Sequence, residues 1–253
     1  MSHFSPALFS FFLELKANNN RDWFQANKDR YDRDVKGPLL QFITDFAPRL
    51  RAIAPSFVAD PRPVGGSMFR IYRDTRFAKD KTPYKTAATA HFRHAATTDD
   101  VHAPGFYLHL EPGEVMIGAG LWQPPTEVQR SIRAAIAEHA PAWTAASQGI
   151  ELWGESLKRV PAPYPADHPK EADLRRKHYV AMITFDEEAA IRDDFMGRVT
   201  AGYERLAPLL AFRGFFWRMA TLAHQAVVTQ EVLLAGVRAF AEQAEPVDTA
   251  TPC

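Results

Sequence analysis

An alternation of apolar and other residues around a short turn constrains the fold of this chain most. Three apolar residues precede the turn at every second position: Phe106, Leu108 and Leu110. Residues 111–114 read Glu-Pro-Gly-Glu, in which proline sets one backbone dihedral and glycine takes a positive one. Four apolar residues follow at the same spacing: Val115, Ile117, Ala119 and Leu121. Two alternating runs joined by so short a loop predict an antiparallel β-hairpin.

Three other segments are predicted to be strands. Residues 67–73 follow a pair of glycines, residues 86–93 alternate weakly, and residues 179–184 form a further short run. Together with helical spacing toward both ends of the chain, these strands predict an α+β fold. Its centre is a central antiparallel sheet built around hairpins, from about residue 67 to residue 122 plus a strand near 179–184. N-terminal and C-terminal helices pack against this sheet.

The N-terminal quarter of the chain has helical spacing. Pro6 fits the first position of a helix, and Ser5 can cap it. Apolar residues then recur on one helix face: Leu8, Phe12 and Leu15. Asn20 is placed to cap a second helix. We expect the Gly-Pro pair at residues 37–38 to interrupt that helix before an apolar stripe resumes and runs to Pro55.

Two later segments return to helical spacing. Thr126 and Gln129 have the spacing of a capping box at the start of a helix that runs to about residue 139. Asp186 can cap a further helix. The apolar face of that helix contains Phe195, Val199, Tyr203, Leu206 and Leu210.

The cysteine content and the N-terminal residues point to a compartment. The only cysteine is Cys253, so no disulfide can form within the chain. The N-terminus lacks the basic and then apolar run of a signal peptide. No stretch approaches the ~20 apolar residues of a membrane span. We therefore expect a cytoplasmic protein that does not associate with membranes.

The basic segment, residues 70–85, carries most of the chemistry that the sequence offers. Its six basic residues are Arg70, Arg73, Arg76, Lys79, Lys81 and Lys85, against two acids, Asp74 and Asp80. Arginine matches carboxylate and phosphate oxygens with two donors, and lysine adds point charge. We expect the arginines to grip an anionic small molecule and the lysines to strengthen the field. Three aromatic side chains are expected to line the pocket: Tyr72, Tyr84 and Trp122.

Two other interpretations of the basic segment stay open. Its arginines can pair with Asp74, Asp80 and acids elsewhere, and so hold a long loop in place. The same residues can also dock nucleic acid or an acidic protein partner. The chain has 30 basic and 30 acidic residues, whereas non-specific binding of nucleic acid rests on many phosphate contacts. This neutral balance disfavours nucleic acid as a partner without excluding it.

His109 is the best candidate for a general base, if the protein is catalytic. It lies opposite the apolar face of the predicted hairpin, and imidazole titrates in a suitable range. Three other histidines are near it in sequence (His91, His94 and His102), but their spacing matches no metal motif such as His-Glu-x-x-His. Residues 118–120, Gly-Ala-Gly, lack the third glycine of a dinucleotide loop and indicate close strand packing. We expect neither a metal nor a cofactor, and the residues leave open whether the protein is an enzyme.

Several stretches of this chain together resemble one protein family. They are residues 18–28 (NNNRDWFQANK), residues 69–85 (FRIYRDTRFAKDKTPYK), and residues 104–110 (PGFYLHL) with residues 118–124 (GAGLWQP). They are similar to the bacterial and fungal conserved hypothetical proteins grouped as domain of unknown function 2461. The resemblance covers about residues 4–212. It implies a soluble α+β domain and brings no established activity, so it implies no catalytic residue.

The chain departs from the family pattern in two places. Ala78 stands where the pattern has a serine. Proteins of this family close soon after the position of Phe212, whereas this chain continues to Cys253. We expect residues 1–212 to form a single α+β domain and residues 213–253 an atypical extension, a helix followed by a disordered tail. An added helix and an altered reading frame both stay open as its origin, and the oligomeric state is not predicted.

Overall fold

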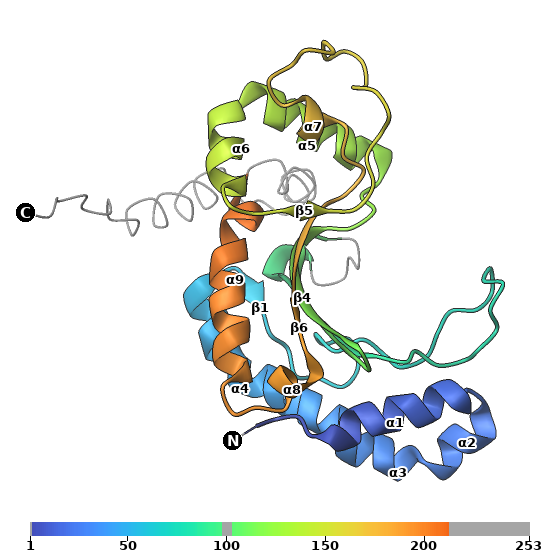
Figure 1. Cartoon of the computed structure of the whole chain (residues 1–253). Coiled ribbons are helices and arrows are strands. Elements are labelled where there is room, and N and C mark those ends of the chain that lie inside the picture. Colours follow the sequence, from blue (N-terminus) through green and yellow to red (C-terminus); the bar gives the residue numbers. More distant parts are fainter. Residues whose placement is uncertain (1, 98–102, 213–253) are drawn as a thin grey trace, which may run out of the picture.

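A six-stranded sheet forms the centre of the fold in the computed structural model, which describes residues 2–97 and 103–212 (Figure 1). Neighbouring strands are all antiparallel, in the order β1-β2-β3-β4-β6-β5. The strands are β1 (Phe57–Val58), β2 (Ala88–His94), β3 (Gly105–Glu111), β4 (Glu114–Leu121), β5 (Leu152–Trp153) and β6 (Tyr179–Phe185). The predicted α+β class and the central antiparallel sheet are confirmed.

Helices precede, interrupt and follow these strands. The N-terminal ones are α1 (Pro6–Ala17), α2 (Arg21–Ala26), α3 (Lys28–Tyr31), the π-helical turn η1 (Asp32–Lys36) and α4 (Gly37–Ile53). The later ones are η2 (Ala95–Thr97), α5 (Thr126–Glu138), α6 (Ala140–Ser147), α7 (Glu171–Leu174), α8 (Glu187–Ala190) and α9 (Phe195–Ala211). Figure 1 shows α4 and α9 along one face of the sheet, and the long loop that contains the basic segment projecting on the other side.

The apolar face of the β3–β4 hairpin is buried beneath α4 and α9. The two strands pair from Gly105 opposite Gly120 to Glu111 opposite Glu114, so the predicted hairpin is confirmed. All seven residues predicted to share its apolar face are buried: Phe106, Leu108, Leu110, Val115, Ile117, Ala119 and Leu121. Tyr203 of α9 packs its ring against Phe106, with the ring centroids 4.8 Å apart. Because side chains alternate between the two faces of a strand, the strict alternation of apolar residues places them all on the buried face of the hairpin.

The opposite face of the same hairpin carries polar side chains. Tyr107, His109 and Glu111 alternate with the core residues of β3, and Thr89 of β2 lies directly opposite His109. The C-terminal end of α1 and part of the basic segment border these side chains. Since α4 and α9 cover the apolar face, this polar face is the one that is left for a binding site.

The close strand packing predicted for residues 118–120 is confirmed. A Cβ atom added to Gly118 would overlap the sulfur of Met182 on β6. A Cβ atom added to Gly120 would overlap the carbonyl oxygen of Tyr179 and lie 2.7 Å from the Cα atom of Val180. The two glycines therefore allow β4 and β6 to approach each other, which accounts for them without a dinucleotide loop.

The prediction of a continuous strand over residues 67–73 is wrong. The first part of this segment hydrogen-bonds the edge of β2, where the Phe69 N–H donates to the Thr89 carbonyl. The chain then leaves the sheet, and the Arg73 N–H donates to the Pro83 carbonyl on the returning arm of the loop. Only isolated bridges are formed, Met68 with Ala90 and Tyr72 with Tyr84. The extended backbone was predicted correctly, but its partners change part of the way along it.

Two predicted helix caps do not form. Pro6 occupies the first turn of α1 as expected, yet the Ser5 side chain makes no capping hydrogen bond. Thr126 does not cap α5, because Pro125 is in the N-cap position. The Gln129 side chain donates to the Pro124 carbonyl instead of closing a capping box. Capping-box spacing fails here because the helix begins at Thr126, one residue earlier than the pattern requires.

The boundaries of two other helices also differ from the prediction. The Gly-Pro pair at residues 37–38 does not interrupt the helix, since the π turn η1 precedes it and the Gly37 N–H donates to the Asp32 carbonyl. This wider turn leads directly into α4 and accommodates the proline. Asp186 caps the short helix α8, where it accepts from the Ala189 N–H. The predicted apolar stripe lies on the separate helix α9.

Asn20 caps α2 as predicted, and its side-chain oxygen accepts from the Trp23 N–H at 2.9 Å. We expect Asn20→Ala to lower the free energy of unfolding by about 1 kcal/mol, because it leaves a helix N–H without this acceptor. Asn20→Asp keeps the acceptor and should be close to wild type. Urea unfolding followed by circular dichroism measures both changes. Equal losses in the two variants would contradict the capping role.

None of the helices in the described residues combines the length and the apolar composition that a membrane crossing needs. The helix and tail predicted for residues 213–253 lie outside the described residues, as does His102.

Candidate functional site

A cavity of about 540 Å³ lies over the polar face of the sheet, and we call it the sheet cavity. Its floor is formed by side chains of β2 and β3 and by the residues just before β2: Thr86, Ala87, Thr89, Tyr107, His109 and Glu111. Its walls come from the end of α1 and from the loop that carries the basic segment: Lys16, Asn19, Phe69, Arg73, Asp80, Thr82, Tyr84 and Lys85. Segments far apart in the sequence therefore build one concave site.

The junction between α1 and α2 fixes the position of the loop. The Asn19 side chain donates to the Tyr84 carbonyl at 3.0 Å and accepts from the Tyr84 N–H at 3.1 Å. The Tyr84 ring stacks on Phe24 of α2, with the centroids 4.2 Å apart. No local pattern in the sequence indicates this role of Asn19, because its partner is 65 residues away.

Arg73 closes the base of the loop. Its Nη1 atom donates to the Asp80 carboxylate at 2.5 Å, to the Thr82 carbonyl at 3.2 Å and to the Thr82 hydroxyl. Hydrogen bonds from the Thr82 N–H and from Arg73 lower the pKa of Asp80 to about 2. The pair is therefore ionised at neutral pH, so the structural interpretation of the basic segment holds for Arg73. This residue nevertheless borders the sheet cavity.

Lys85 is a half-buried cation at the wall of the sheet cavity. Its ammonium lies 5.0 Å from the centroid of the Phe69 ring, and the residue is half-buried. Burial lowers the pKa of the ammonium, and the charge of Arg70 lowers it further. Across residues 2–97 and 103–212, no carboxylate lies within ion-pair distance of Lys85. An ammonium ion that has lost part of its hydration here therefore has no oppositely charged partner among the residues that the structure describes.

A row of hydrogen-bonded side chains forms the floor of the cavity. The Thr86 hydroxyl donates to Glu111 Oε1 at 2.7 Å, and Glu111 Oε2 lies 3.2 Å from His109 Nε2. On the other side of the imidazole, the Tyr107 hydroxyl lies 3.1 Å from His109 Nδ1. Burial raises the pKa of Tyr107 to about 12, so its phenol stays protonated at neutral pH. His109 lies on the polar hairpin face, as the sequence predicted.

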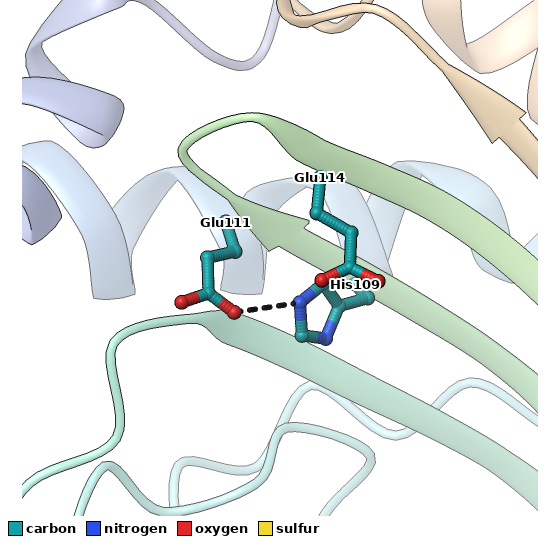
Figure 2. Close-up of side chains that lie close together, drawn as sticks. All are labelled: His109, Glu111 and Glu114. Carbon is teal, nitrogen blue, oxygen red and sulfur yellow. Dashed lines mark hydrogen bonds and ion pairs between the residues drawn. The ribbon is translucent and has the colours of Figure 1, made fainter.

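Glu114 joins this row from the neighbouring strand (Figure 2). It lies directly opposite Glu111 across the turn, and ligand atoms of His109, Glu111 and Glu114 are all within 4.8 Å of one another. Histidine spacing alone does not indicate this cluster, because two of its three members are glutamates. A two-residue turn flanked by glutamates, with a histidine two residues earlier, was the available signal, since hairpin register puts all three on one face.

The structure divides the residues that were predicted to bind a ligand into two groups. Four of them, including the candidate base, border the sheet cavity: Arg73, Tyr84, Lys85 and His109. Six do not border it: Arg70, Tyr72, Arg76, Lys79, Lys81 and Trp122. The first five of these are exposed on the loop of the basic segment.

Several of the residues outside the cavity have local partners, among them Lys81, whose Nζ donates to the Thr75 carbonyl at 2.8 Å. Arg76 pairs with Asp74 at 2.7 Å, and this hydrogen bond lowers the pKa of Asp74 to about 2. Trp122 stacks on His178 and on Trp153, with centroid distances of 4.0 and 5.0 Å, and does not line the sheet cavity. For Arg76, simple pairing accounts for the charge.

His91 and His94, the two histidines of β2, do not join the cluster. His91 stacks on Phe69, with the ring centroids 6.0 Å apart. His94 meets the Phe57 ring edge-on at 5.5 Å. Both histidines therefore contact different neighbours from those of His109.

Comparison with known proteins gives one match. A family model described as conserved hypothetical protein (DUF2461) matches residues 7–212. Neither the search of curated proteins nor the search of solved structures gave a match. The matched range includes every residue of the sheet cavity and ends where the described structure ends.

Proposed function

This chain belongs to the DUF2461 family of conserved hypothetical proteins, and because that description names no activity, we propose a function from the site itself: the protein binds an anionic small molecule in the sheet cavity. The ligand is phosphorylated or carboxylated. Lys85 and Lys16 hold its charge, with Arg73 at the edge of the cavity, and aromatic side chains contact its less polar part.

The observation that carries this proposal is the half-buried Lys85 without an ion-pair partner in the described part of the chain. Removing an ammonium ion from water costs free energy unless an opposite charge or hydrogen-bond acceptors compensate. The face of the Phe69 ring offers a weak cation–π contact. An anion in the cavity would provide a much stronger partner, since charge-assisted hydrogen bonds are the stronger ones.

The cations that line the cavity, Lys16, Arg73 and Lys85, outnumber its two carboxylates, Asp80 and Glu111. Asp80 already accepts hydrogen bonds from Arg73 and from Thr82. Glu111 accepts from Thr86 and lies next to His109. Of these two carboxylates, Asp80 is thus paired with a cation, Arg73, whereas no carboxylate of the described residues pairs with Lys16 or Lys85.

The size and walls of the cavity suit a metabolite. Ligand sites in proteins usually enclose about 300–1,000 Å³, with mostly apolar walls and a few polar groups. The sheet cavity, at about 540 Å³, lies within that range. The rings of Phe69, Tyr84 and Tyr107 provide apolar wall surface, and Thr82 and Thr89 provide hydroxyl groups.

We expect Lys85→Met to weaken anion binding by about 10- to 100-fold, because hydrogen bonds to charged groups contribute about 1.5–3 kcal/mol. Lys79→Met is the matched control: it removes the same charge from the same loop at an exposed position outside the cavity. The measurement is a thermal-shift screen against inorganic phosphate, sugar phosphates, nucleotides and dicarboxylates, followed by calorimetric titration. If no anion stabilises the wild type, or if both variants bind equally well, the proposal is lost.

The alternative function, an interaction protein, is supported by the outer half of the basic segment. Arg70, Lys79 and Lys81 are exposed, and Phe77 between them has a relative exposure of 95%. Exposed cations that alternate with an aromatic ring are typical of surfaces that bind single-stranded nucleic acid. Fluorescence anisotropy with a labelled oligonucleotide separates the two functions. The alternative predicts that Lys79→Met with Lys81→Met abolishes binding while Lys85→Met does not.

A further inference from the structure

The end of the β3–β4 hairpin brings together three side chains that are common metal ligands. His109 and Glu111 share one face of β3, and Glu114 begins β4 directly across the turn. Figure 2 shows the three side chains directed toward one another from the two strands. From this arrangement we propose that His109, Glu111 and Glu114 bind a divalent transition-metal ion at the rim of the sheet cavity.

The distances within the cluster fit a single ion. One ligand atom from each residue can be chosen so that all three lie within 4.8 Å of one another. Bonds of about 2.0–2.2 Å from zinc to nitrogen or oxygen put donor atoms at most about 4.4 Å apart. Rotation of the exposed Glu114 side chain is sufficient to close the remaining few tenths of an ångström.

Residues outside the cluster hold two of the ligands in the orientation that a metal requires. The Tyr107 hydroxyl contacts His109 Nδ1, which leaves Nε2 for the ion when Nδ1 carries the proton. The Thr86 hydroxyl donates to Glu111 Oε1 and leaves Oε2 on the side of His109. Metal-binding histidines and carboxylates are usually oriented by such second hydrogen bonds.

The charges of the cluster also favour a cation. Glu111 and Glu114 are direct cross-strand neighbours, and like charges in that position destabilise a hairpin. In the described residues, no lysine or arginine forms an ion pair with either glutamate. A divalent ion between them would neutralise both carboxylates. The expectation of no metal site, which rested on histidine spacing, did not consider these two carboxylates.

The donor set indicates the class of metal. One imidazole nitrogen with two carboxylate oxygens suits zinc, manganese or iron, whereas magnesium and calcium prefer oxygen ligands alone. For a nitrogen–oxygen site, affinity rises along the first-row series from manganese to copper and then falls to zinc, which still binds more tightly than manganese. We therefore expect Zn²⁺ to bind more tightly than Mn²⁺, and Mg²⁺ more weakly than either. His109 and Glu111 also border the cavity, so open coordination positions of the ion would face it.

Calorimetric titration of the full chain, first treated with EDTA, tests the site with ZnCl₂, MnCl₂ and MgCl₂. We expect one Zn²⁺ ion per chain that is lost, or weakened at least tenfold, in His109→Ala, Glu111→Gln and Glu114→Gln. Tyr107→Phe should weaken it by about tenfold without removing a ligand. His139→Ala is the matched control, because His139 lies 3.7 Å from Glu138 in a histidine–glutamate pair outside the cluster.

The outcomes of this titration decide the proposal. Once the EDTA has been removed by dialysis, the titration contains no phosphorylated or carboxylated ligand, so the result is independent of the proposed ligand-binding function. Circular dichroism establishes that each variant is folded, and Glu114→Gln is the safest variant because it changes an exposed side chain to one of nearly equal shape. Absence of Zn²⁺ binding to the wild type would overturn the proposal. Equal binding by wild type and all three ligand variants, or Mg²⁺ binding as tight as Zn²⁺ binding, would overturn it too.

Discussion

Replacement of Tyr203 by alanine is expected to lower the free energy of unfolding by about 3–5 kcal/mol, which is the range for deletion of a large buried aromatic side chain. Tyr203 is completely buried between the sheet and α4. Its ring contacts Phe106 of β3, Phe92 of β2 and Phe46 of α4, with centroid distances of 4.8, 6.2 and 5.6 Å. The truncation leaves a cavity between three elements that cannot collapse together.

Tyr203→Phe separates the ring from the hydroxyl group. The hydroxyl donates to the carbonyl of Tyr107 at 2.9 Å, so its removal should cost about 1 kcal/mol. Urea unfolding monitored by circular dichroism gives both values, and an unchanged slope shows that the two-state analysis applies. If Tyr203→Ala costs no more than Tyr203→Phe, ring packing is not the main role of this residue.

The second large effect is expected at Gly120, where alanine should lower the free energy of unfolding by about 3 kcal/mol or more. Gly120 has a φ of +130°, which residues other than glycine rarely adopt. Such backbone strain costs about 1–3 kcal/mol. The added methyl group would also overlap the carbonyl of Tyr179 on β6. Overpacking adds about 1–3 kcal/mol, because backbone atoms inside a sheet cannot move aside.

Gly113→Ala is the matched control for Gly120→Ala. Gly113 also has a positive φ, +80°, but a Cβ atom there would meet nothing within 4 Å. It therefore reports the cost of the backbone conformation alone, which we expect to be about 1 kcal/mol. The difference between the variants in denaturant unfolding measures the clash between β4 and β6. A difference near zero would show that the strands separate easily.

The fold was largely predictable because its strongest signals are local. The β3–β4 hairpin follows from alternation around a Pro-Gly turn, and its predicted core residues are all buried. The stripe from Phe195 to Leu210 likewise predicted an amphipathic helix. Predictions failed where a partner outside the segment decided the outcome. Residues 67–73 are extended as expected, but their hydrogen bonds go first to β2 and then to the returning loop.

The candidate site was predicted in part, for a related reason. The charge of the basic segment and the face of His109 can be read from residues close together in the chain. Which of its basic residues border the cavity cannot be predicted from the sequence, because that depends on where the loop folds back. The contact between Asn19 and Tyr84 anchors the returning arm, so Lys85 faces the cavity while Lys79 stays in solvent.

By itself, the sequence determined the α+β class, the central hairpin with its apolar and polar faces, and the segment with the highest density of positive charge. Only the tertiary structure decided which cations border a cavity, which are held by a neighbouring acid, and that Lys16 of α1 joins them. The physical reason is the range of the interactions. Periodicity and turn geometry act over a few residues, whereas a concave site is closed by contacts between segments that are tens of residues apart.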